Sequence, residues 1–100
     1  MYEIKQVMDN DSRGAFVIEV GNERVAEMAF GINRDVMIVY HTEVNERLKG
    51  QGVAQLLLDH MVNFVRSNHY KVYPLCPYVS VQFKRHADKY GDLLAERPAK

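Results

Sequence analysis

The segment formed by residues 47–52 has side chains and glycines of the kinds that can hold an anion. Arg47 and Lys49 can donate charged hydrogen bonds, while Gly50 and Gly52 lack the Cβ atom that keeps a backbone away from a bound oxygen. Apolar residues at helical spacing begin directly after Gly52. The first turn of a helix has unpaired backbone N–H groups and a positive dipole end, so we predict a phosphate site here.

A glycine-rich turn between a strand and a helix can also bind nothing and serve only to redirect the chain. The segment has neither the Gly-x-Gly-x-x-Gly of dinucleotide-binding folds nor the Gly-Lys-Ser/Thr of nucleotide triphosphate loops. It does match Arg/Gln-x-x-Gly-x-Gly/Ala, with Arg47, Gly50 and Gly52 in the defined positions. That pattern is the pyrophosphate-binding signature of the GNAT N-acetyltransferases, which the chain therefore resembles.

The resemblance covers residues 41–94 and is closest to a branch of short GNAT-like proteins of about this length. Before residue 41, only the order of the elements is similar. In the last block Ala87 occupies a place where the branch usually has proline. The matching blocks are His41-Thr42-Glu43-Val44, Gly50-Gln51-Gly52-Val53-Ala54, Pro74-Leu75-Cys76-Pro77-Tyr78-Val79, and Arg85-His86 with Tyr90 and Asp92-Leu93-Leu94.

The resemblance implies that acetyl-CoA (coenzyme A) is the cofactor and that an unknown amine, on a small molecule or a protein, is the acceptor. It assigns the pantetheine arm to the strand end before the loop, and the phosphates to the loop itself. For His86 and its basic neighbours, contact with phosphate or adenine competes with a plain exposed basic face. The predicted cofactor-binding residues are Thr42, Val44, Arg47, Leu48, Lys49, Gly50, Gln51, Gly52, Val53, Ala54, Cys76, Tyr78, Lys84, Arg85 and His86.

Three side chains are candidates for catalysis. The resemblance places Cys76 near the acetyl group, where a thiolate could accept it, although a lone cysteine is also a common small core residue. His41 and Glu43 could each take a proton from an incoming amine. A hydrogen-bonded structural histidine and a solvated carboxylate are the competing interpretations. His60 lies on the apolar stripe of the predicted helix, so we expect it to be packed rather than catalytic.

Three functions fit these residues. The first is an acetyltransferase that moves acetyl to an amine, either directly or through Cys76. The second is an acyl-CoA-binding or regulatory module with little catalysis, because the chain lacks the early helices that help build the acceptor pocket of full GNAT enzymes. The third is a non-enzymatic interaction domain in which Gly50 and Gly52 only shape a turn, and failure to bind CoA would identify it.

The elements that position these residues follow from hydrophobic patterning. Apolar residues at the spacing i, i+3, i+4, i+7 predict an amphipathic helix over residues 53–65. A strand follows at residues 71–75, and because strand–helix–strand units cross over in a right-handed sense, it should lie parallel to the strand before the loop. Residues 78–90 are predicted to form a second helix, and residues 95–100 a loose tail. The strands predicted ahead of the loop are residues 2–8, 15–20, 23–30 and 36–44.

The predicted fold is therefore α/β (mixed α+β), in one GNAT-like domain over residues 1–100. It has a mixed sheet, in which an antiparallel four-strand meander is followed by a β-α-β crossover and a C-terminal helix. The 100 residues are 47% hydrophobic and 26% charged, which is ordinary for a single folded domain.

The charge balance and the cysteine content argue against several classes of partner and favour one cellular location. Thirteen basic residues balance thirteen acidic ones, so no net field favours nucleic acid or an anionic membrane surface. No apolar run near the N-terminus suits a signal peptide or a membrane span, and the lone Cys76 fits a reducing compartment, so a cytoplasmic location is expected. Neither Cys-x-x-Cys nor His-Glu-x-x-His occurs, so no metal site is predicted. The oligomeric state is not specified by the sequence.

Overall fold

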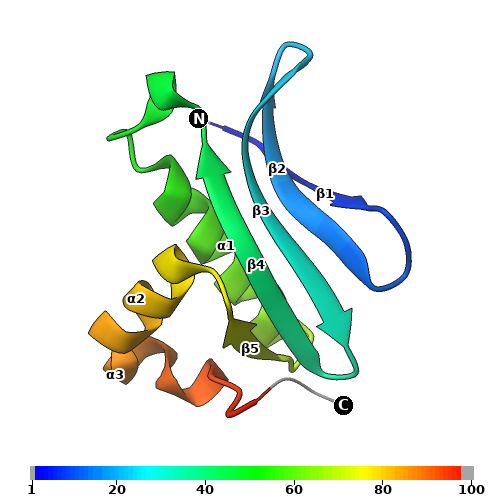
Figure 1. The fold of residues 1–100 in the computed structure, drawn as a ribbon, viewed down its shortest axis with the longest axis vertical. Coiled ribbons are helices and arrows are strands. Elements are labelled where there is room, and N and C mark those ends of the chain that lie inside the picture. The colour runs from blue at the N-terminus through cyan, green and yellow to red at the C-terminus, as the bar shows by residue number, and fades with distance from the viewer. Residues whose placement is uncertain (1, 98–100) are drawn as a thin grey trace.

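The computed structural model describes residues 2–97, in which one five-stranded sheet carries helices against it (Figure 1). The strand order along the sheet is the order in the sequence, with β1 to β4 antiparallel and β5 parallel to β4. The predicted mixed sheet, with its meander and its parallel crossover, is confirmed. The strands are β1 (Ile4–Met8), β2 (Arg13–Val20), β3 (Glu23–Asn33), β4 (Val36–Val44) and β5 (Lys71–Pro74).

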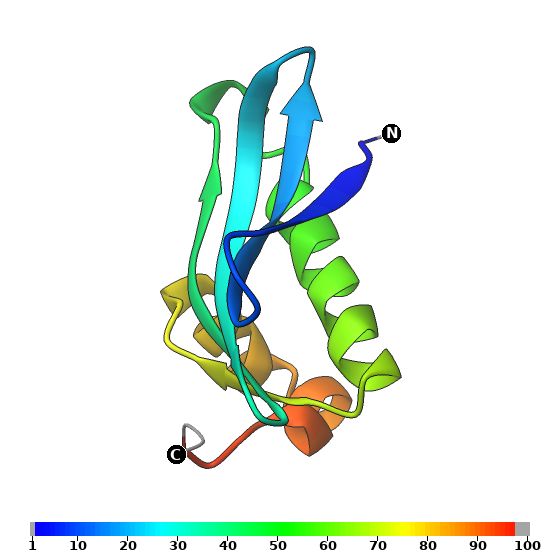
Figure 2. The same cartoon turned by 90° about the vertical axis from the view of Figure 1, so that its right-hand side faces the viewer.

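The crossover helix occupies the predicted place and extends two residues further. Figure 2 shows it running alongside one face of the strands. The helices are η1 (Glu46–Leu48), α1 (Val53–Ser67), α2 (Pro77–Arg85), α3 (Ala87–Tyr90) and η2 (Gly91–Leu93). The second predicted helix is divided into α2 and α3, and two single 3₁₀ turns, η1 and η2, were not predicted.

The prediction of one continuous helix over residues 78–90 is wrong at His86. There the backbone leaves helical geometry, with φ −119° and ψ 50°, and the His86 carbonyl accepts hydrogen bonds that start α3. The bend brings the rings of Phe83 and Tyr90 into a stack with centroids 5.0 Å apart. A straight helix would separate side chains seven positions apart by about 10 Å, so the stacking of the two rings requires the break.

The predicted loose tail is ordered at its beginning. Leu94 forms a parallel bridge with Val72 of β5, and the Ala95 N–H donates to the Val72 carbonyl at 2.8 Å. The end of the described chain is thus attached to the edge of the sheet. The remaining part of that prediction, residues 98–100, lies outside the described residues.

The core lies between α1 and the inner face of β2 to β4. Phe16 on β2 is fully buried, and its ring contacts Phe30 (centroids 4.7 Å apart), Phe64 (5.5 Å) and His60 (4.9 Å). Burial also holds the pKa of the His60 imidazole below its usual value, which agrees with a packed rather than catalytic role. The sheet and α1 are therefore joined by an aromatic cluster, which involves the middle and the C-terminal half of the helix.

Truncating the centre of this cluster should strongly destabilise the protein. We expect Phe16→Ala to lower the free energy of unfolding by about 3–5 kcal/mol, since it removes a whole ring from a closely packed site. Val20→Ala on the same strand, where the side chain is 52% exposed, should change it by less than about 0.5 kcal/mol. Urea unfolding would measure both values, and a loss below about 1 kcal/mol for Phe16→Ala would contradict this description of the core.

Candidate functional site

An irregularity in β4 decides which side chains face the helices. The register pairs Ala29 with His41 but Phe30 with Val39, so β4 has one extra residue at Tyr40. Such a bulge shifts the alternation of side chains between the two faces of a strand. Val39 is buried on the inner face before the bulge, and Thr42 faces the helices after it.

The strands β4 and β5 separate immediately beside this bulge. Their parallel pairing ends at Val39 and Pro74, and the N–H groups of Leu75 and Cys76 both donate to the Val39 carbonyl, at 3.0 and 2.9 Å. Beyond this point β5 turns into α2, while β4 continues to Val44 without a β5 partner. The end of β4 and the start of α2 therefore diverge and leave space between them.

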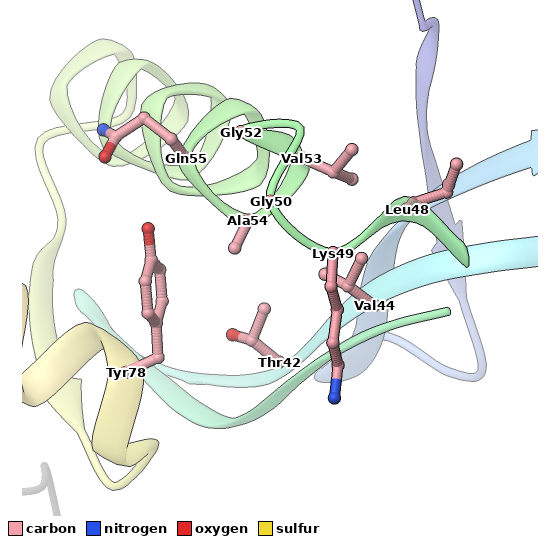
Figure 3. A pocket seen from close by; sticks show the side chains of 10 residues that line it. All are labelled: Thr42, Val44, Leu48, Lys49, Gly50, Gly52, Val53, Ala54, Gln55 and Tyr78. Atoms are coloured by element: carbon pink, nitrogen blue, oxygen red, sulfur yellow. The ribbon is translucent and has the colours of Figure 1, made fainter. Parts of the chain in front are cut away.

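That space is a cavity of about 330 Å³ under the first turn of α1. Figure 3 shows Thr42 of β4, Tyr78 of α2 and Ala54 of α1 pointing toward it. Gln55 also lines the cavity, although it was not predicted as a site residue. Its position in the first turn of α1, directly after the glycine loop, could have indicated it. The lining residues are Thr42, Val44, Leu48, Lys49, Gly50, Gly52, Val53, Ala54, Gln55 and Tyr78.

The loop above the cavity exposes backbone. Gly50 and Gly52 have φ of 84° and 76°, a left-handed conformation that favours glycine, and a Cβ on either would meet no other atom within 4 Å. No side chain caps α1 at Gly52, and the first helical hydrogen bond is donated by Leu56 N–H to the Gly52 carbonyl at 3.1 Å. The N–H groups of the first turn thus point to an open end, which is suited to an anion.

The two cations of the loop each have a carboxylate partner. Arg47 Nη2 lies 3.1 Å from Glu23 Oε1, and Lys49 Nζ lies 2.9 Å from Glu46 Oε2. Of the two, Lys49 lines the cavity and Arg47 does not. Gln51 is also outside the lining, and its amide donates to the Arg47 carbonyl at 3.3 Å.

Cys76 lies behind the wall of the cavity. Its side chain is 2% exposed, and its Sγ is 3.3 Å from Thr42 Oγ1, a contact in which either group can be the donor. Cys76 is also the N-cap residue of the nine-residue helix α2. The thiol therefore contacts a hydroxyl group of a residue that lines the cavity.

Tyr78 has a phenol that resists ionisation. Burial raises the pKa of this group above its ordinary value, and the Asp59 carboxylate adds to the rise. The phenol therefore remains protonated at neutral pH, where it can donate a hydrogen bond or a proton.

The two candidate bases, His41 and Glu43, do not line the cavity. Because of the bulge, His41 and Glu43 are exposed and are not among the cavity's lining residues. His41 Nε2 is 3.0 Å from Glu27 Oε2, and this hydrogen bond is the main reason that the pKa of the Glu27 carboxyl is lowered. The structure thus brings His41 together with Glu27 on neighbouring strands rather than with Cys76.

The basic end of α2 is also distant from the cavity lining. Lys84 lines a separate, mostly apolar hollow with Pro74 and Leu94, while Arg85 is exposed. The His86 ring packs edge-on against Tyr90, with centroids 6.3 Å apart. None of these three basic residues lines the space under α1.

The described residues contain neither a candidate metal site nor a candidate membrane-spanning helix. Among residues 2–97, no group of three or more His, Cys, Asp or Glu side chains is placed to hold a metal ion. No helix within the same range is both long and apolar enough to cross a membrane.

Comparison with known proteins was made on both sequence and structure. The family model described as GCN5-related N-acetyl-transferase matches residues 15–93. No curated protein matches the chain in sequence. The structure is similar to the solution structure of a GCN5-like protein from Staphylococcus aureus, with 28% identity and a TM-score of 0.70 over 96% of this chain and 90% of that one.

Longer enzymes share the fold at lower identity. A ribosomal-protein-alanine N-acetyltransferase from Brucella melitensis biovar Abortus 2308 is 17% identical, with a TM-score of 0.61 over 91% of this chain and 67% of that one. The ribosomal-protein-S18-alanine N-acetyltransferase from Escherichia coli is 13% identical, with a TM-score of 0.60 over 66% of this chain. The chain spans only 43% of the length of that enzyme.

Proposed function

The chain belongs to the GCN5-related N-acetyltransferase family, and from this premise we propose that it transfers an acetyl group from acetyl-CoA to an amine acceptor through Cys76. The observation that carries the proposal is the cavity that connects the glycine loop, at the start of α1, to Thr42 and the adjacent thiol. The family and its fold support acetyl transfer in general, and these residues support the more specific route.

The cavity suits the cofactor on physical grounds. The glycine loop and the first turn of α1 present N–H groups to the CoA phosphates, and Lys49 adds a cation at the rim. The unpaired side of β4 after Val39 offers backbone groups to the amides of the pantetheine arm. Apolar walls from Val44, Val53 and Ala54 fit the remainder of that arm.

Bound acetyl-CoA supplies an acetyl group on a sulfur leaving group. The Cys76 sulfur attacks the acetyl carbonyl carbon, the bond from that carbon to the CoA sulfur breaks, the proton of the Cys76 thiol passes to the leaving CoA sulfur, and an acetyl thioester forms on Cys76. An amine then attacks this thioester and releases the Cys76 thiol with the acetylated product. The Thr42 hydroxyl, at 3.3 Å from Sγ, orients the sulfur for the first step.

The acceptor is proposed to be an amine of a small molecule or a protein. The names of the Brucella and Escherichia coli enzymes show that members of this fold acetylate a protein alanine. His41 and Glu43 are exposed on the opposite face of β4 from the cavity, so the proposal gives neither of them a role in proton transfer at Cys76. A reducing cytoplasmic location fits a mechanism that needs a free thiol.

Removing the Tyr78 hydroxyl should separate binding from chemistry. We expect Tyr78→Phe to bind CoA with wild-type affinity but to transfer acetyl at least about tenfold more slowly, because in the proposed step the phenol donates to the leaving CoA sulfur as it takes the proton of the Cys76 thiol, and so stays protonated. Single-turnover acetylation measures the rate, and calorimetry measures the affinity. An unchanged transfer rate would remove Tyr78 from the chemistry.

A second function is favoured by one observation. Cys76 is 2% exposed, so its thiol is shielded unless Thr42 or Tyr78 moves. If this shielding persists when CoA is bound, the protein is an acyl-CoA-binding module. Mass spectrometry of the protein after incubation with acetyl-CoA, together with an assay of acetyl transfer to an amine, distinguishes the two, because the binding module gains no acetyl group on Cys76 and transfers none to the amine.

A further inference from the structure

The signature arginine of the loop contacts β3 instead of the cavity. Arg47 Nη2 lies 3.1 Å from Oε1 of Glu23, the first residue of β3. The Arg47 Nε donates to Asn45 Oδ1 at 3.4 Å. The Arg47 side chain is therefore directed toward the sheet, although the sequence pattern suggested contact with phosphate.

Asn45 completes the attachment of the loop to β3. Its Oδ1 also accepts the Arg47 N–H at 2.9 Å, which caps η1, and its own N–H donates to the Val25 carbonyl at 2.7 Å. Two points of β3 thus hold the start of the loop, one through the backbone at Val25 and one through the ion pair at Glu23. Since 24 positions separate Glu23 from Arg47, the ion pair fixes the loop relative to the sheet.

Lys49 is arranged differently. It lines the cavity, and its partner Glu46 lies three positions away in the same loop. Opening this local pair leaves the attachment to β3 intact, so Lys49 can turn to a phosphate. Opening the Arg47 pair would instead release the loop from one of the two points that attach it to β3.

We propose that Glu23 and Arg47 are a positioning pair for the CoA loop, and that Arg47 itself does not contact the CoA phosphates. The proposal rests on the proposed function, because the loop is taken to be the phosphate site. Phosphate binding by backbone N–H groups depends on the loop being held in one geometry before the ligand arrives. Glycines at positions 50 and 52 make the free loop flexible, so an external attachment lowers the entropy lost on binding.

The direction in which one substitution changes the affinity for CoA distinguishes this positioning role from direct contact with phosphate. If the pair positions the loop, Glu23→Gln loosens the loop and weakens CoA binding. If Arg47 binds phosphate, the same substitution releases its guanidinium and removes a negative charge near a polyanion, so binding becomes tighter. The two models therefore predict opposite changes in affinity.

Calorimetric titration with CoA should be done on the wild type, Glu23→Gln, Arg47→Gln and the double variant. We expect each single substitution to weaken binding about threefold, which corresponds to the strength of an exposed ion pair, and the double variant to be no weaker than either single one. Glu19→Gln is the matched control, since Glu19 is also exposed and its ion-pair partner is Lys5 on β1. Unchanged or tighter binding by Glu23→Gln overturns the positioning pair.

Hydrogen exchange in the absence of CoA tests the pair independently of the ligand. Amides of residues 48–52 should exchange faster in Glu23→Gln than in the wild type, while those in the middle of α1 should not change. Equal exchange rates in the loop would overturn the proposal. If the wild type fails to bind CoA, the proposed function fails, but the exchange rates still decide whether Glu23 holds the loop.

Discussion

Replacing Gly52 with valine is expected to reduce affinity for CoA by at least about a hundredfold, a change of about 2.7 kcal/mol. Two effects contribute to this loss of affinity. Gly52 has φ of 76°, where a β-branched residue is strained, and relief of that strain would move the loop. The new side chain would also project at the N-cap of α1, beside the N–H groups proposed to hold phosphate. Titration calorimetry with CoA measures the loss.

Gly21→Val is the matched control for the backbone strain. Gly21 has φ of 64° in the turn between β2 and β3, and a Cβ there would likewise meet no atom within 4 Å. The two variants should therefore lose similar stability, while only Gly52→Val loses CoA binding. Full affinity in a folded Gly52→Val protein would show that the loop is not the phosphate site.

Replacing Cys76 with alanine is expected to abolish acetylation of the protein and to slow acetyl transfer to an amine by at least about a hundredfold. CoA affinity should stay within about threefold of the wild type, since Cys76 lies behind the cavity wall and does not line it. Intact-protein mass spectrometry detects the acetyl-enzyme, and a thiol-release assay follows turnover.

Thr42→Val provides the comparison for this variant. It keeps Cys76 but removes the hydroxyl that lies 3.3 Å from Sγ, so acetylation should be slowed without being lost. Wild-type turnover by Cys76→Ala would contradict the thioester route and would favour direct attack of the amine on acetyl-CoA. Loss of turnover with retained CoA binding assigns the chemistry to the thiol.

The parts of the fold that the sequence predicted are those dictated by local pattern. Leu57, Met61 and Val65 recur at helical spacing and are all fully buried, so α1 was evident before the structure. The strands of the meander were separated by turn-forming residues, and the handedness of the crossover fixed β5 beside β4. The loop was predicted because Gly50 and Gly52 precede a helix start and, with Arg47, match the pyrophosphate-binding signature of the family that the chain resembles.

Tertiary contacts determined what the sequence could not show. The extra residue at Tyr40 depends on the register with β3, and it is this bulge that turns Thr42 toward the cavity and leaves His41 on the other face. The break at His86 accompanies the stacking of Phe83 on Tyr90, a contact that helical spacing alone does not predict. The contact of Arg47 with Glu23 joins residues from different elements, and no spacing rule relates them.

The most direct test of the account is a calorimetric titration of the purified wild-type protein with acetyl-CoA and with CoA. If the loop at the start of α1 binds the CoA phosphates, both ligands should bind saturably with one site per chain. The heat of binding should then disappear in Gly52→Val but not in Gly21→Val. Absence of binding to a folded wild-type protein at high ligand concentration would contradict the account, and the loop would then be only a turn between β4 and α1.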